Sequence, residues 1–260
     1  MNTNMPFLPE RPLKPRNSGL TMMMDKGLSL NEAVNFSESS GDFTDLVKFG
    51  FGTAIFSKQI REKSAVYRNS NIEPYFGGTL FESYIVRNMF DEFRSFVSKM
   101  GMETVEVSDG SMRIEHDEKL EYVSKLSKDF KVLSEVGSKV KGAEIPHDVW
   151  VSFMKKELDA GAYKVIAEAR ESGTIGIYNS DGSANIDLVN DILENVKGDN
   201  VLWEAPVKNQ QAWFIDLLGA NVNLGNIAPN EVVAMEALRL GLRGDTFFNY
   251  LPEEFQDRKL

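Results

Sequence analysis

The feature that most constrains the fold of this chain is an alternation along its length. Short, mostly apolar segments rich in β-branched and aromatic residues are separated by longer amphipathic segments, an order typical of βα units and a parallel sheet. The ranges predicted to form strands are 20–27, 46–53, 73–79, 103–111, 131–137, 164–173, 201–206 and 220–227. Eight strand–helix units in about 240 residues predict an α/β fold, a single (β/α)8 TIM barrel, whose usual length is about 250 residues.

Three of the intervening segments carry clear helical signals. Apolar residues recur at helical spacing in 81–101, while 146–162 and 228–244 each have Pro near the start and Gly near the end. An open doubly wound sheet is the rival architecture. It is disfavoured because the first strand-to-helix turn, DKGLSLNEA, lacks a Gly-rich phosphate fingerprint.

The chain shows no linker or shift in composition that would divide it into two domains. Residues 1–18 contain four prolines and are expected to form an N-terminal arm outside the barrel, which then spans 19–260. The arm also indicates self-association as a homo-oligomer.

Charge and composition exclude several classes of protein. A net charge of −10 opposes general binding to nucleic acid or to an anionic membrane surface. The absence of Cys rules out disulfides and thiolate chemistry, and the two histidines, expected at helix starts, leave little room for His-based sites. No apolar run approaches the roughly 20 residues of a membrane span, and the N-terminus lacks a signal-peptide pattern. A cytoplasmic protein is expected.

Charged residues gather near the carboxyl ends of the predicted strands, where active sites of (β/α)8 barrels lie. Glutamates occupy four consecutive strands: Glu106, Glu135, Glu168 and Glu204. A single strand glutamate more often faces solvent. Four glutamates at matching positions of consecutive strands favour side chains that face the barrel lumen. Residues two apart share a face of a strand, so each glutamate has an apolar or small neighbour on its own face. Like charges would crowd there, so a divalent metal, lysines or arginines must lie among them.

A phosphate-binding site is predicted separately, after the last strand. The turn NLGNIAPNE contains Gly225 and Asn226 and leads into the final helix, and the arginines Arg170 and Arg243 could add bidentate contacts. In many barrels the loops after strands seven and eight bind phosphate.

The motifs together resemble those of the phosphosulfolactate synthase family, in order and across essentially the whole chain. They are RPLKPRNSGLTMMMDKG, VKFGFGT, PYFGGTLFE, VEVSDGS, VLSEVGSK, EARESG, WEAPVKNQQAWFI, NVNLGNI and LRLGLRGDTF. The resemblance implies a TIM barrel and a Mg²⁺-dependent addition of sulfite to phosphoenolpyruvate. The implied product is (2R)-2-phospho-3-sulfolactate, formed in the first step of the sulfonate route to coenzyme M in methanogens.

Roles for individual residues follow as hypotheses. The family's proton donor is a lysine just after strand five, which the motif SEVGSK matches to Lys139. Candidate Mg²⁺ ligands are Glu106, Glu135 and Glu168; candidates for neutralising the two anionic substrates are Lys26, Lys48, Arg170 and Lys208; and candidates for phosphate are Gly225, Asn226 and Arg243.

Two other functions remain open. The family also resembles plant heat-stress-associated proteins, which implies a protective, non-enzymatic role. Alternatively, the barrel could host another lyase or aldolase that acts on a phosphate-bearing substrate, with Lys139 as a Schiff-base amine.

Overall fold

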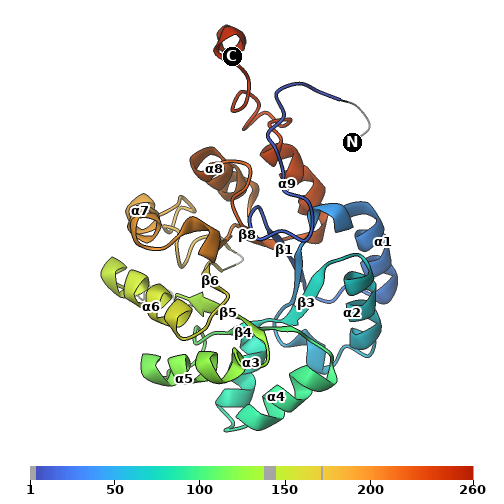
Figure 1. Cartoon of the computed structure of the whole chain (residues 1–260), viewed down its shortest axis with the longest axis vertical. Coiled ribbons are helices and arrows are strands. Elements are labelled where there is room, and N and C mark those ends of the chain that lie inside the picture. The colour runs from blue at the N-terminus through green and yellow to red at the C-terminus, as the bar shows by residue number, and fades with distance from the viewer. Residues whose placement is uncertain (1–3, 138–144, 171, 260) are drawn as a thin grey trace.

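The computed structural model describes residues 4–137, 145–170 and 172–259. Its centre is a closed barrel of parallel strands in sequential order, surrounded by helices (Figure 1). The strands are β1 (Thr21–Asp25), β2 (Leu46–Phe49), β3 (Glu73–Phe76), β4 (Thr104–Val107), β5 (Lys131–Val136), β6 (Lys164–Ala167), β7 (Val201–Glu204) and β8 (Leu224–Ile227). The predicted (β/α)8 barrel is confirmed.

The helices form an outer ring around the barrel (Figure 1). They are α1 (Leu30–Ser40), α2 (Ile60–Asn69), α3 (Gly78–Ile85), α4 (Phe90–Lys99), α5 (His116–Leu126), α6 (His147–Asp159), α7 (Ile186–Asn195), α8 (Lys208–Leu218) and α9 (Val232–Arg239). Short 3-10 turns include η4 (Pro229–Glu231) and η5 (Glu253–Arg258). Local sequence explains where some helices begin. Ser29 and Glu32 form a reciprocal capping box at the start of α1, which satisfies two backbone N–H groups that have no partner within the helix.

The barrel interior has an apolar layer beneath a charged one. The apolar layer is one contiguous buried cluster: Leu20, Met22, Leu46, Tyr75, Leu133, Ile166 and Leu202. Two residues further along their strands, on the same face, lie the charged Lys48, Glu135, Glu168 and Glu204. The predicted period-two alignment is therefore confirmed, and the apolar layer seals the lumen below the charged groups.

The helices and strands lie where the sequence predicts them, but several of them begin or end at other residues. Each predicted strand contains an observed strand that is shorter, because the ladder stops where the barrel opens into loops. The single helix predicted at 81–101 is two helices, since Asn88 between them has φ 56°, outside the right-handed helical region. The helix predicted at 228–244 is confined to η4 and α9.

The N-terminal segment is tied to the amino-terminal end of the barrel. Arg16 donates two hydrogen bonds of 2.9 Å to Asp45, which precedes β2, and Arg11 pairs with Glu236 of α9 at 2.9 Å. Lys14 donates to the carbonyls of Gly41, the first residue of the 3-10 turn η1 (Gly41–Phe43), and of Thr44, the residue after that turn. These contacts lie at the opposite end from the charged layer. The division into an arm and a barrel at residue 18 stays a prediction.

Within the described residues, no helix combines the length and the apolar character needed to cross a bilayer.

Candidate active site

A cavity of about 500 Å³ opens at the carboxyl ends of the strands. Its charged lining residues are Lys48, Glu106, Glu135, Glu168, Arg170 and Glu204. The apolar part of the lining includes Met24, Phe51 and Ile175. Each residue comes from a strand or from the loop that follows it, so barrel closure alone brings together groups that are more than 150 residues apart in sequence.

Lys48 of β2 lies among carboxylates from three other strands. Its Nζ is 3.0 Å from Glu106, 3.4 Å from Glu135 and 3.2 Å from Glu204. Burial by itself lowers the pKa of the Lys48 ammonium, but the surrounding carboxylates outweigh burial and hold that pKa well above its ordinary range. The lumen thus contains a permanent cation, as the crowding of glutamates predicted.

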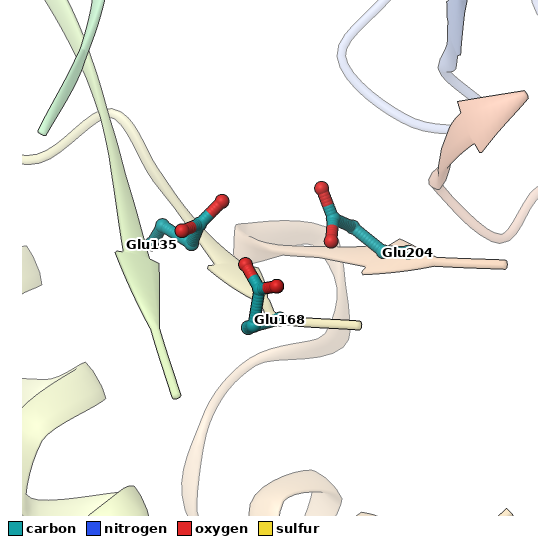
Figure 2. A group of neighbouring side chains, drawn as sticks. All are labelled: Glu135, Glu168 and Glu204. Atoms are coloured by element: carbon teal, nitrogen blue, oxygen red, sulfur yellow. The ribbon is translucent and has the colours of Figure 1, made fainter. Parts of the chain in front are cut away.

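Three of the glutamates converge from neighbouring strands. Glu135, Glu168 and Glu204 are all buried, and each offers one carboxylate oxygen within 4.8 Å of the others. Figure 2 shows the three side chains pointing toward one another. Burial raises the pKa of Glu204 to about 7, although Lys48 acts in the opposite direction. Closely spaced, desolvated carboxylates of this kind favour a cation between them.

Glu106 is held differently. Its Oε1 accepts a hydrogen bond of 2.6 Å from the backbone N–H of Gly78, at the start of α3, and lies beside Lys48. A side chain at Gly78 would collide with Ser108, so only glycine lets the backbone approach this closely. Glu106 therefore serves as an anion at a helix N-terminus. The three mutually close carboxylates are those of Glu135, Glu168 and Glu204. Glu204 was predicted to face the lumen but was not among the predicted metal ligands.

Two of the other predicted site residues line the cavity. Arg170 follows β6 and is exposed at the mouth. Asn226 of β8 has φ 60°, and its Nδ2 donates to the carbonyl of Ala169 at 3.1 Å. The Oδ1 of Asn226 is buried and has no hydrogen-bond partner among the described residues.

Four other predicted residues do not line the cavity. Within the described part of the chain, the lining of the cavity does not include Lys26, Lys208, Gly225 or Arg243. Lys208 pairs with Asp245 at 2.8 Å. Gly225 leaves room for Met22, whose Cε would be 2.8 Å from an added Cβ, so this glycine serves packing inside the barrel. Lys139 lies outside the described residues.

The charged end of β1 has a structural explanation that the sequence did not reveal. Asp25 points outward from the barrel and pairs with Lys63 of α2 at 2.6 Å, and Tyr67 donates a hydrogen bond to it at 2.9 Å. Its other oxygen accepts from the backbone N–H groups of Gly27 and Leu28. Asp25 thereby fixes the loop after β1. Helical spacing in 60–69 places Lys63 and Tyr67 on one face and could have suggested this contact.

Both histidines begin helices, as predicted. His116 starts α5 and contacts Glu157, while His147 starts α6 and pairs with Asp191. Neither is among the residues that line the cavity.

Comparisons with known proteins show the family of the chain. A family model described as (2R)-phospho-3-sulfolactate synthase (ComA) matches residues 9–245. A phosphosulfolactate synthase of Bacillus subtilis (strain 168) is 40% identical over 246 residues, covering 93% of this chain and 97% of that protein. A phosphosulfolactate synthase of Methanothermobacter thermautotrophicus is 41% identical over 244 residues, covering 92% of this chain and 95% of that protein.

Among solved structures, 3-hexulose-6-phosphate synthase from Salmonella typhimurium is similar to this chain, with a TM-score of 0.53. The alignment covers 86% of this chain and 100% of that chain at 14% sequence identity. At that identity the likeness shows the fold alone.

Proposed function

Since the chain belongs to the (2R)-phospho-3-sulfolactate synthase family, we propose that it catalyses the Mg²⁺-dependent addition of sulfite to phosphoenolpyruvate. The product would be (2R)-2-phospho-3-sulfolactate. The observation that carries the proposal is the cavity itself, where a buried lysine and a convergent set of carboxylates meet at the carboxyl ends of the strands.

The reaction requires positive charge at a defined place. The lone pair on sulfur attacks the methylene carbon C3 of phosphoenolpyruvate, and the π electrons move into the carboxylate to give an aci-carboxylate. A proton is then added at C2. Both reactants are anions, and the carboxylate gains further charge as the carbon–sulfur bond forms. Preorganised cations at that carboxylate would therefore lower the barrier.

The residues present fit a magnesium ion. Mg²⁺ prefers oxygen ligands and usually binds through one or two carboxylates with several waters. Glu135, Glu168 and Glu204 supply oxygens close enough to share one cation. When bound, such a cation supplies positive charge against the developing carboxylate. Glu106 stays a predicted ligand, but its contacts with Lys48 and Gly78 support a role in holding the ammonium.

The chain's own cations would act on the substrates directly. Lys48 keeps its charge because its pKa is held high, so it is suited to neutralise an anion inside the lumen. Arg170 at the mouth is suited to bind sulfite or phosphate. Asn226 lines the cavity and is a candidate for the phosphate. Gly225 and Arg243, which do not line it, remain predicted phosphate contacts. We assign proton donation at C2 to Lys139, with Lys26 and Lys208 as further predicted substrate contacts.

The proposal is tested by incubating the purified protein with phosphoenolpyruvate and sulfite and following the phosphorus spectrum. We expect a new phosphate-ester signal that needs sulfite and that disappears when Mg²⁺ is chelated. Consumption of phosphoenolpyruvate without sulfite, or no consumption by a folded protein with both reactants and Mg²⁺, would contradict the proposal.

A further inference from the structure

The backbone carbonyls of the three convergent glutamates are each held by a group outside the strand ladder. The carbonyl of Glu168 accepts from the N–H of Ile177 at 3.1 Å, and that of Glu204 accepts from the hydroxyl of Tyr178 at 2.7 Å. Lys119 donates to the carbonyl of Glu135 at 2.5 Å. Two of these three contacts come from adjacent residues in the loop between β6 and α7 (Figure 1).

This part of the loop is built to lie close to the strands. Gly176 has φ 81°, and an added Cβ there would collide with the carbonyl oxygen of Glu168. Ile177 and Tyr178 are buried, and Tyr178 forms an isolated bridge with Ala184. The segment 176–178 is thus fixed on both sides, by the strand ends within the barrel and by the rest of its own loop.

Glu204 is connected to the loop after β6 through both its backbone and its side chain. The N–H of Ala169, the residue after Glu168, donates to Oε2 of Glu204 at 2.8 Å. The hydroxyl of Tyr178 holds the carbonyl of the same glutamate. Ile177, the residue before Tyr178, donates to the carbonyl of Glu168. Residues 177 and 178 therefore link the backbones of Glu168 and Glu204, whose carboxylates converge.

We propose that Tyr178 is a positioning residue that sets the spacing between the carboxylates of Glu168 and Glu204. The proposal rests on the cation site in the proposed function. The hydroxyl of Tyr178 and the carbonyl of Glu204 are both buried, so the hydrogen bond between them is shielded from water. Removing that hydroxyl leaves the carbonyl of Glu204 without its partner and lets the end of β7 relax away from β6.

Tyr178→Phe removes one oxygen and keeps the ring that packs in the core. The matched control is Tyr163→Phe, which also loses one hydroxyl contact, to Asn17, away from the cavity. Binding of Mn²⁺ as a probe, followed by its electron paramagnetic resonance signal, should be about tenfold weaker in Tyr178→Phe, since residues that orient metal ligands typically contribute that much. Tyr163→Phe should bind like the wild type.

A second measurement does not depend on metal. In chelator-treated protein, the amide of Ala169 should exchange its hydrogen faster in Tyr178→Phe than in the wild type, because the carboxylate that accepts from it is less well held. Unchanged exchange at Ala169 would overturn the positioning role, whatever the metal result. If the wild type binds no Mn²⁺, the cation site of the proposed function fails, while exchange at Ala169 still decides the role of Tyr178.

Discussion

The ammonium of Lys48 lies 3.0 Å from Oε1 of Glu106, and both side chains are almost wholly buried in the barrel lumen. The two strands that carry them are not neighbours, because β3 separates β2 from β4. The pair therefore reaches across the barrel mouth. A buried pair of this kind costs desolvation, which is offset here because the same ammonium also lies near Glu135 and Glu204.

Lys48→Met should therefore impair both stability and turnover. Removing one partner of a buried ion pair typically costs about 3–5 kcal/mol of folding free energy, and here it also removes the cation proposed to neutralise substrate. Thermal unfolding and phosphoenolpyruvate turnover measure the two effects. Lys164→Met is the control, since Lys164 is also buried but donates to the backbone carbonyls of Asn17 and Asp199, away from the cavity. It should lose stability and keep turnover. Wild-type turnover by Lys48→Met would refute the neutralising role.

The raised pKa of Glu204 predicts a pH dependence of stability in chelator-treated protein. The folded state holds the proton up to a pH of about 7, whereas the unfolded chain releases it near the ordinary value of 4.5. Between these values the folded state binds more protons than the unfolded state, so stability should fall as pH rises, and then level off. In Glu204→Gln this contribution should vanish. If the melting temperatures of the wild type and of Glu204→Gln change with pH in parallel, the raised pKa of Glu204 is contradicted.

Lys139→Ala tests the proton donor. If Lys139 protonates C2, its loss should lower turnover by about 10²- to 10⁴-fold, the usual contribution of general acid catalysis. Lys141→Ala, two residues further along the chain, is the control and should retain most of the activity. Steady-state rates with phosphoenolpyruvate and sulfite provide the comparison. An alanine variant at 139 that works at the wild-type rate would exclude this assignment.

How far the sequence predicted the fold can be seen at particular residues. Short, mostly apolar segments between amphipathic ones identified all eight strands, because barrel strands are buried on both faces and so read as nearly continuous apolar runs. The ends were less accurate. Apolar residues keep helical spacing through 81–101, so this spacing does not reveal that Asn88 adopts a positive φ and separates α3 from α4. The only local signal is the residue type, since Asn adopts that conformation more readily than most residues.

The site was predicted as a set of positions and not as a set of contacts. Strand position and alternation correctly indicated that Glu135, Glu168 and Lys48 face the cavity. They could not show that Lys48 pairs with Glu106 or that Glu204 joins Glu135 and Glu168. Those relationships depend on the stagger of the strands around the closed barrel, which no local pattern specifies.

A change in the N-terminal segment should lower stability without lowering turnover. Arg16→Ala removes a bidentate pair with Asp45, a carboxylate that also accepts from the N–H of Thr21 at the start of β1. Leaving Asp45 buried without its cation should lower the melting temperature, while turnover at moderate temperature stays within about twofold, because the contact lies at the amino-terminal end of the barrel. A large loss of turnover in a folded Arg16→Ala protein would show that this end of the barrel affects the site.

The most direct test of the account is the rate of sulfite-dependent phosphoenolpyruvate consumption by Glu168→Gln at saturating Mg²⁺. Glu73→Gln, a change in a glutamate at the amino-terminal start of β3, serves as the control. The account predicts a loss on the order of 100-fold for Glu168→Gln, with a melting temperature close to that of the wild type, and wild-type turnover for Glu73→Gln. Equal rates for Glu168→Gln and the wild type would contradict the claim that catalysis takes place among these carboxylates.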